Sequence, residues 1–206
     1  MYSATSHRPI PIAEALRVKP KTFRHVILDR DGVLNREAEG GGYVCEPAEF
    51  HWLPGALEGL AILRRAGVRL TIATNQSGVG RGLMSAAQLA AVHAHMQAQA
   101  AAAGGALDAV LVCPHAPQAL CLCRKPAPGL IQAAIVRSGI PAAESLVVGD
   151  DARDLEAARR AGVTAALVRT GKGRKTEAQL SASDVAVYDD LEQLARALAA
   201  GQLTVQ

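Results

Sequence analysis

The stretch FRHVILDRDGVLN, residues 23 to 35, places a short apolar run directly before two aspartates and a glycine. An apolar run of this length that ends in polar residues is typical of a strand buried in a parallel sheet. Asp29 and Asp31 therefore stand at the carboxyl end of the predicted strand, where Gly32 allows the backbone to turn sharply. If the rest of the chain supplies neighbouring strands, these carboxylates lie at the edge of a sheet.

Further strands and helices alternate along the chain. Similar apolar runs occupy residues 68–74, 106–113, 144–150, 163–169 and 184–190, and helical stretches occupy residues 56–66, 85–103, 129–138 and 151–161. A glycine follows each helical stretch, as expected of a left-handed helix C-cap. This alternation predicts an α/β fold: a doubly wound three-layer sandwich with a mainly parallel central sheet.

Length and composition predict one soluble domain. The chain has 206 residues, of which 50% are hydrophobic but only 3% aromatic, so we expect a core of Ala, Leu and Val. We expect residues 1–22 to form an N-terminal extension and residues 23–200 to form the domain. The net charge of +3 comes from scattered Lys and Arg, which indicates no nucleic-acid partner. No apolar run at the N-terminus resembles a signal peptide or spanning helix, so we expect a cytoplasmic location and no membrane partner.

A second acidic cluster follows the fourth predicted strand. It contains Asp150, Asp151 and Asp154 in the stretch VVGDDARDLEAA. Because ligands of doubly wound sheets bind at the carboxyl ends of the strands, the two acidic clusters are expected to meet there. They would repel each other unless a cation lay between them, and Mg²⁺ prefers such oxygen ligands. The alternative is that these residues are ordinary turn aspartates and helix caps.

The two remaining strand ends carry groups suited to phosphate. Hydroxyl and amide side chains follow the second strand, at Thr74, Asn75, Gln76 and Ser77. Arg124 and Lys125 follow the third strand and offer cations. Taken alone, these are an ordinary turn and a solvated basic surface. Together with a carboxylate nucleophile and a metal site, they indicate phosphoryl transfer through an aspartyl-phosphate.

The loop CPHAPQALCLC, residues 113–123, groups four metal ligands. They are Cys113, His115, Cys121 and Cys123. Three thiolates and an imidazole predict a tetrahedral Zn²⁺ site that is structural, because four protein ligands leave no open position. A disulfide is the competing interpretation, which would use two sulfurs and leave His115 without a role. Cys45 lies elsewhere and is expected to be a free thiol.

Four motifs in order, DRDG, TNQSG, CRKP and GDDARD, resemble the motifs of the haloacid dehalogenase (HAD) superfamily of phosphohydrolases. More narrowly, GGYV, ATNQSGVGRGL and LVRTGKGRKT resemble the subfamily of heptose-bisphosphate and histidinol-phosphate phosphatases. The resemblance implies a HAD-like Rossmannoid fold without a large cap domain. It also implies Mg²⁺-dependent hydrolysis of the C7 phosphate of D-glycero-D-manno-heptose 1,7-bisphosphate, within ADP-heptose and lipopolysaccharide core biosynthesis. The alternatives are histidinol-phosphate phosphatase and a catalytically silent zinc-bearing interaction module.

The resemblance also implies roles for individual residues. Asp29 would be the nucleophile and Asp31 the general acid and then base. The phosphoryl group would be held by Thr74 and Lys125, and other substrate contacts would come from Asn75, Gln76, Ser77 and Arg124. Mg²⁺ would bind Asp29, Asp150 and the main-chain oxygen of Asp31, with Asp154 supporting that site. Arg124 would recognise the second phosphate of the sugar.

Two features depart from the subfamily pattern. The segment REAEGGGYV, residues 36–44, is longer than expected, and Asp151 stands where a lysine is familiar. Both lie where relatives contact substrate, so they bear on the choice of sugar. We expect small loops to close the site around a small phosphorylated sugar, in a monomer.

Overall fold

The computed structural model describes residues 22–180 and 185–203, and its centre is a six-stranded parallel sheet. The strands are β1 (His25–Leu28), β2 (Arg69–Asn75), β3 (Ala109–Cys113), β4 (Ser145–Gly149), β5 (Thr164–Val168) and β6 (Ala186–Tyr188). Their order in the sheet is β3-β2-β1-β4-β5-β6, and every neighbouring pair is parallel. All six predicted strands and the parallel sheet are confirmed.

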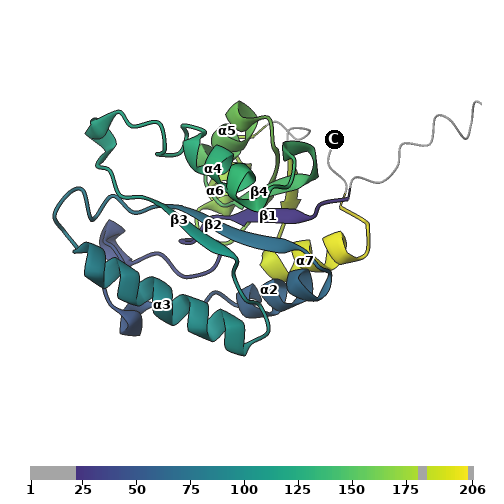
Figure 1. Ribbon diagram of the computed structural model, residues 1–206, viewed down its shortest axis with the longest axis horizontal. Helices are drawn as coiled ribbons and strands as arrows, with labels where there is room; N and C mark the ends of the chain where they lie inside the picture. Colours follow the sequence, from purple (N-terminus) through teal and green to yellow (C-terminus); the bar gives the residue numbers. More distant parts are fainter. Residues whose placement is uncertain (1–21, 181–184, 204–206) are drawn as a thin grey trace, which may run out of the picture.

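Helices cover both faces of the sheet, as the predicted three-layer sandwich requires. Figure 1 shows α2 (Ala56–Arg65), α3 (Ala86–Ala102) and α7 (Leu191–Ala199) on one face, with α4 (Gly129–Ser138) and α5 (Ala152–Ala161) on the other. The short helix α6 (Gly173–Glu177) follows β5. Helices α6 and α7 were not predicted from the sequence. Helix α7 packs against α2 and completes that layer.

Alternation along the strands builds two cores, one on each face. On β1, Val26 and Leu28 belong to the core beneath α2, α3 and α7, whereas Ile27 belongs to the core beneath α4 and α5. On β4, Val148 and Val147 divide in the same way. Because successive side chains of a strand point to opposite faces, a strand buried on both sides needs a continuous apolar run. The sheet is therefore packed on both faces directly beneath the predicted site residues.

Helix ends follow the predicted signals to within one residue: α2 ends at Arg65 rather than at residue 66, and α3 spans Ala86–Ala102 rather than residues 85–103. Gly139 and Gly162 adopt left-handed conformations after α4 and α5, with φ of 67° and 69°. Helix α5 begins at Ala152 rather than at Asp151, because the Asp151 carboxylate accepts a hydrogen bond from the main-chain N–H of Arg153, 3.0 Å away, and acts as the N-cap. Asp151 is consequently held at the rim of the sheet.

The sheet order places β1 between β2 and β4, where the winding of the sheet reverses. Leu28 at the end of β1 pairs with Ile72 of β2 and Val148 of β4, so the carboxyl ends of these strands meet. Within the described residues, the segment between β1 and α2 contains only the short 3-10 helices η1 (Glu39–Gly41) and η2 (Pro47–Glu49), in agreement with the expected lack of a large cap domain. Crevices at such reversal points are the usual ligand sites.

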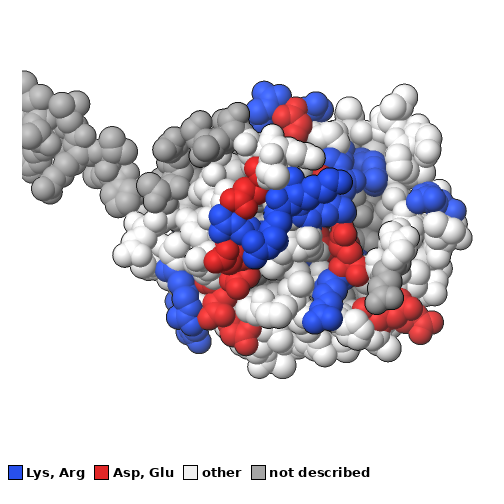
Figure 2. Space-filling view, turned by 180° about the vertical axis from the view of Figure 1, so that it is seen from behind, with Lys and Arg blue, Asp and Glu red and all other residues white. Residues whose placement is uncertain are grey.

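The predicted extension lies almost entirely outside the described residues, so the domain boundaries at residues 22 and 200 stay predictions. No helix in the described part of the chain has the length and apolar character needed to cross a membrane. On the face drawn in Figure 2, Lys and Arg lie beside Asp and Glu. Exposed ion pairs such as Arg169 with Asp189, 2.8 Å apart, also occur. The absence of a nucleic-acid partner stays a prediction.

Candidate active site

A pocket of about 300 Å³ lies at the carboxyl edge of the sheet and brings the predicted site residues together. The predicted residues that line it are Asp29, Asp31, Thr74, Asn75, Gln76, Ser77, Arg124, Lys125, Asp150 and Asp154. They come from four strand ends spread over more than 120 positions of sequence. The sequence therefore identified the location of the pocket, although not the contacts inside it.

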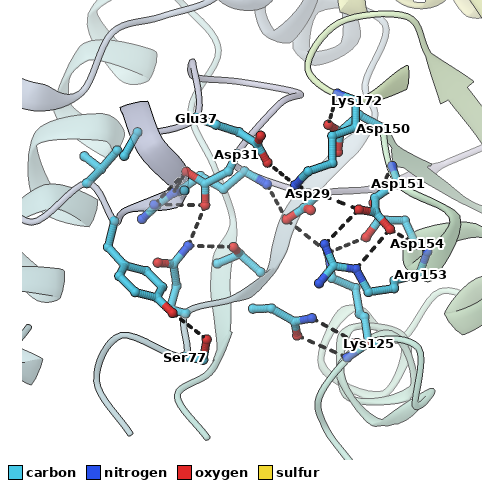
Figure 3. A pocket seen from close by; sticks show the side chains of 18 of the residues that line it. Asp29, Asp31, Glu37, Ser77, Lys125, Asp150, Asp151, Arg153, Asp154 and Lys172 are labelled. Atoms are coloured by element: carbon cyan, nitrogen blue, oxygen red, sulfur yellow. Dashed lines mark hydrogen bonds and ion pairs between the residues drawn. The ribbon is translucent and has the colours of Figure 1, made fainter. Parts of the chain in front are cut away.

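Lys125 is a buried cation between two carboxylates. Its Nζ lies 3.0 Å from Oδ1 of Asp29 and 2.6 Å from Oδ1 of Asp154, and its side chain is 3% exposed (Figure 3). Burial alone would lower the pKa of Lys125, but the charges of Asp154 and Asp29 outweigh it and raise the pKa. The lysine is therefore a permanent cation beside the predicted nucleophile.

Asn75 fixes the main chain of Lys125. The Asn75 amide accepts a hydrogen bond from the Lys125 N–H at 3.1 Å and donates one to the Lys125 carbonyl at 3.0 Å. This pair joins the end of β2 to the segment after the cysteine loop. Substrate binding by Asn75 stays a prediction, and the structure gives its side chain a second task that the sequence did not indicate.

Three carboxylates form an acidic cluster beside Lys125. One oxygen each of Asp29, Asp150 and Asp154 lies within 4.8 Å of the others. Burial, followed by the charges of Asp29 and Asp154, raises the pKa of Asp150 to about 8. Burial also raises the pKa of Asp29, although Lys125 opposes that shift. One lysine does not balance three carboxylates, so the cluster has the charge and the hard oxygen ligands that suit Mg²⁺.

Two glycines make room for Asp150. A Cβ atom at Gly32 would lie 2.0 Å from Oδ2 of Asp150, and one at Gly171 would lie 2.1 Å from the same atom. Both glycines have positive φ, at +84° and +54°. The same oxygen accepts a hydrogen bond from the main-chain N–H of Lys172 at 2.7 Å. The loops after β1 and β5 thus fix the Asp150 carboxylate at the reversal point of the sheet.

Asp31 lies on the opposite side of Asp29 from Asp150 and Asp154 (Figure 3). Its Oδ1 accepts hydrogen bonds from Arg30 Nη2 at 2.8 Å and Asn35 Nδ2 at 2.9 Å, and its Oδ2 accepts one from Gln76 Nε2 at 2.7 Å. Burial would raise the pKa of Asp31, but the charge of Arg30 and these hydrogen bonds together lower it. The side chain of Asp31 is therefore separate from the acidic cluster and has its own set of donors.

Gln76 also donates to Oγ1 of Thr74 at 2.9 Å, so it joins the predicted acid–base residue to the predicted phosphate-binding hydroxyl. Both Gln76 and Thr74 are buried, at 1% exposed each. Substrate binding by Gln76 stays a prediction. Like the Asn75 side chain, the Gln76 side chain already forms hydrogen bonds within the protein, here with Asp31 and Thr74.

The segment of residues 36–44 reaches the pocket through Tyr43. The Tyr43 hydroxyl lies 2.9 Å from Oγ of Ser77 and accepts a hydrogen bond from Arg81 Nη1 at 3.0 Å. Arg124 lines the same pocket, and its Nη1 atom is buried without a hydrogen-bond partner among the described residues. An unpartnered buried guanidinium nitrogen indicates a place for an anionic ligand group.

Further charged residues at the pocket were missed by the sequence analysis. Arg153 donates to both oxygens of Asp151, from Nε at 2.9 Å and from Nη2 at 2.7 Å. Lys172 forms an ion pair with Glu37 from the segment after β1. The sequence signal for Arg153 is the nearby Asp151. This carboxylate stands where a lysine is familiar in the subfamily, and in the structure it holds the Arg153 cation at the pocket.

The four ligand atoms of the cysteine loop converge. Cys113 Sγ lies 3.6 Å from His115 Nδ1 and 3.6 Å from Cys121 Sγ, while Cys123 Sγ lies 3.2 Å from His115 Nδ1. Separations of this size exceed the 2.05 Å bond of a disulfide, and all four cysteines of the described chain are free. The loop is compatible with Zn²⁺, because three thiols and one imidazole lie within 4.8 Å of one another.

The parallel sheet, the acidic cluster and the buried lysine define the class, that of the HAD-like hydrolases. The family described as "HAD-hyrolase-like" matches residues 122–194. A D-glycero-beta-D-manno-heptose-1,7-bisphosphate 7-phosphatase from Bordetella bronchiseptica is 46% identical over 154 residues, which is 75% of this chain and 85% of the relative. One from Pseudomonas putida is 39% identical over 173 residues, 84% of this chain and 98% of the relative.

A solved structure gives the same result. The D,D-heptose 1,7-bisphosphate phosphatase of B. bronchiseptica, complexed with magnesium and phosphate, superposes with a TM-score of 0.80 at 42% identity. The match covers 85% of this chain and 98% of that structure. The chain belongs to the family of the heptose 1,7-bisphosphate 7-phosphatases within the HAD-like hydrolases.

Proposed function

We propose that the protein is a Mg²⁺-dependent phosphatase that hydrolyses the C7 phosphate of D-glycero-D-manno-heptose 1,7-bisphosphate. The observation that carries the proposal is the Asp29 carboxylate, 3.0 Å from Lys125 Nζ and clustered with Asp150 and Asp154 at the reversal point of the sheet. Support comes from relatives named for this activity and from a homologous structure that contains magnesium and phosphate.

In the proposed reaction, a carboxylate oxygen of Asp29 attacks the phosphorus of the C7 phosphate. The ester bond between phosphorus and the sugar oxygen breaks, and Asp31 protonates the departing oxygen. Asp31 then takes a proton from water, whose oxygen attacks the aspartyl-phosphate and releases inorganic phosphate from Asp29. Two chemical steps with one acid–base group therefore restore the enzyme.

The ligands proposed for Mg²⁺ are Asp29, Asp150 and the main-chain oxygen of Asp31. When bound, the ion neutralises negative charge on the phosphoryl oxygens. Asp154 supports the site by its ion pair with Lys125, and its Oδ2 accepts a hydrogen bond from the Asp151 N–H at 3.2 Å. Thr74 and Lys125 hold the transferring phosphoryl group from the protein side.

Substrate recognition is assigned to Arg124 and the end of β2. The buried, unpartnered Nη1 of Arg124 supports a contact with the C1 phosphate, which remains on the product. Ser77, with Asn75 and Gln76, completes the proposed substrate contacts along the turn after β2. Arg124 on one phosphate and Asp29 on the other would orient the sugar for release at C7.

The structural metal proposed for the cysteine loop is Zn²⁺, held by Cys113, His115, Cys121 and Cys123. Four protein ligands occupy a tetrahedral ion fully, so the metal stabilises the loop and takes no part in the reaction. The protein is further proposed to act as a cytoplasmic monomer in the synthesis of ADP-heptose for the lipopolysaccharide core.

Turnover on two substrates tests the proposal. Phosphate release is measured with heptose 1,7-bisphosphate and with histidinol phosphate, with Mg²⁺ and with EDTA. The proposal expects Mg²⁺-dependent release from the heptose, and phosphorus NMR should show loss of the C7 signal only. Preference for histidinol phosphate would favour the alternative phosphatase. Inactivity on both substrates and on aryl phosphates would favour the silent zinc-bearing module.

A further inference from the structure

Arg30 is a fully buried guanidinium next to the predicted nucleophile. It is 1% exposed and is among the largest side chains that the fold buries completely. A buried charge is strongly unfavourable unless it is paired and hydrogen-bonded. Arg30 Nη2 contacts both carboxylate oxygens of Asp31, at 2.8 and 3.0 Å, and its Nε lies 3.3 Å from one of them. The Nε and Nη2 atoms of the guanidinium therefore both donate hydrogen bonds to Asp31.

The other side of Arg30 is held by a histidine. Nη1 lies 3.0 Å from Nε2 of His93, which is 7% exposed on α3 and 63 positions away in sequence. A guanidinium donates hydrogen bonds and cannot accept them, so Nε2 of His93 must carry a lone pair. The ring is therefore neutral with its proton on Nδ1.

The surroundings of His93 favour this neutral form. Burial first, and then the charge of Arg30, lower the pKa of His93 to about 4, against a smaller opposite effect of Asp31. His93 remains a hydrogen-bond acceptor at neutral pH. His93 is not among the residues that line the pocket, whereas Arg30 is, so the hydrogen bond to Arg30 connects His93 to the pocket.

The chain of contacts fixes the orientation of Asp31. A guanidinium is planar, so an acceptor on Nη1 fixes the plane in which Nη2 and Nε meet the carboxylate. Asn35 and Gln76 each donate a hydrogen bond to one oxygen of Asp31, so these two bonds hold the carboxylate and not the Arg30 guanidinium. Without His93, the flexible arginine would lose one of its two anchors.

We propose that His93 and Arg30 are positioning residues for proton transfer by Asp31, with His93 fixing the guanidinium that orients this carboxylate. The inference rests on the proposed function, in which Asp31 protonates the sugar oxygen and then activates water. Displacement of a catalytic group by about 1 Å can lower a rate about 100-fold. Replacement of His93 should therefore lower kcat by about 10- to 100-fold with little change in KM.

A purely structural role for His93 would weaken the fold and slow all substrates alike. The positioning role predicts a dependence on the leaving group. The sugar alkoxide needs a proton from Asp31, whereas p-nitrophenolate leaves without one. First-turnover release of p-nitrophenol should therefore be nearly unaffected, while hydrolysis of the phosphoenzyme, for which Asp31 is the base, becomes slow.

The experiment compares three variants with the wild-type holoenzyme. His93→Leu removes the acceptor, His93→Gln can place an amide oxygen near the former Nε2, and His93→Asn is too short to do so. Steady-state kinetics on heptose 1,7-bisphosphate and rapid-quench release of p-nitrophenol are measured for each. We expect His93→Leu and His93→Asn to lose kcat on the sugar but to keep the p-nitrophenol burst within about twofold, and His93→Gln to recover most activity. His95→Leu, on the same helix, is the control.

Several results would overturn the inference. One is equal activity of His93→Gln and His93→Asn. Another is an equal decrease in kcat on heptose 1,7-bisphosphate and in the rate of the p-nitrophenol burst. A third is wild-type turnover by His93→Leu. If His93→Leu does not fold, the comparison of Gln with Asn decides. Asp31→Asn distinguishes failure of the proposed acid–base role of Asp31 from failure of the positioning role of His93. Full activity of Asp31→Asn would refute the role of Asp31. An inactive Asp31→Asn together with a His93→Leu of normal activity would refute the positioning role alone.

Discussion

The carboxylate of Asp29 is fixed by two hydrogen-bond donors from different parts of the chain. Lys125 Nζ and the Arg30 main-chain N–H both contact Oδ1 of Asp29, at 3.0 and 2.7 Å. Because two donors meet one oxygen, the orientation of the carboxylate is set before substrate binds. A group held in this way tolerates a change of charge without a change of shape, which makes Asp29→Asn an informative substitution.

Asp29→Asn should lower turnover by at least about 1,000-fold, because the amide lacks the anionic oxygen that attacks phosphorus. The metal-free protein should become more stable, since one of three mutually repelling carboxylates is removed. Phosphate release and thermal unfolding in EDTA measure the two effects. Retention of roughly a tenth of normal activity is incompatible with a covalent role for Asp29.

Arg124→Ala should damage turnover of the bisphosphate far more than that of a monophosphate. A lost hydrogen bond to a charged group is worth about 1.5–3 kcal/mol, or about 10- to 150-fold in kcat/KM. The exposed Arg137 at the end of α4 supplies the control Arg137→Ala. Equal losses on both substrates, or loss of the C1 phosphate by phosphorus NMR, would contradict the assignment of Arg124 to the second phosphate.

At the level of elements, the cysteine loop connects the core to the two cations. Cys113 ends β3 and packs in the core beneath α4 and α5, and its carbonyl accepts a hydrogen bond from the Gln76 N–H at 2.8 Å. At the other end of the loop, Cys123 directly precedes Arg124 and Lys125. A metal at this loop would fix the main chain from which both cations project, although it lies outside the reaction.

Cys121→Ser and Cys123→Ser should lower zinc content and activity together while the α/β core stays folded. Loss of a ligand loosens the loop, and the resulting shift of Lys125 is expected to slow turnover by about 10- to 100-fold. Elemental analysis, kinetics and circular dichroism measure these effects, with Cys45→Ser as the control. A wild-type protein that is fully active without zinc would rule out this role of the loop.

The elements were predictable because each strand and helix has a local signal. Apolar runs gave the strands, and glycines marked the helix ends. Helix α7 was missed although Asp190 caps it and Leu191, Leu194 and Leu198 repeat at helical spacing. That spacing and the capping aspartate are both sequence signals of a helix. The contact of Arg30 with His93 has no such signal, since it depends on how α3 packs against the turn after β1.

At the level of the whole molecule, the parallel sheet concentrates charge at one edge. Strand ends that are distant in sequence meet there because neighbouring strands run in the same direction and in register. The sequence therefore predicted which residues share the pocket. It could not predict which of them pair, because Asn75 and Gln76 found partners in other segments through tertiary packing. The same concentration leaves the metal-free fold with unbalanced negative charge.

This imbalance predicts how Mg²⁺ and pH act on the stability of the whole protein. The pKa of Asp150 rises to about 8 in the fold from its ordinary value of 3.8, so the folded state binds this proton more tightly than the unfolded state does. The contribution of Asp150 to stability is fully present below about pH 4 and is lost as pH rises through about 8. Mg²⁺ binds the ionised carboxylates, so its stabilisation should be larger at pH 8 than at pH 5.

Thermal unfolding between pH 5 and 8, in EDTA and in Mg²⁺, measures both effects. In EDTA, Asp150→Asn should reduce the fall of Tm with rising pH, because the neutral amide has no proton to lose. The difference between the variant and the wild type isolates this group from the other titrating residues. The same variant should show little stabilisation by Mg²⁺ at pH 8. Wild-type stabilisation by Mg²⁺ that is equal at pH 5 and pH 8, or that survives in Asp150→Asn, would exclude Asp150 as a ligand of the ion.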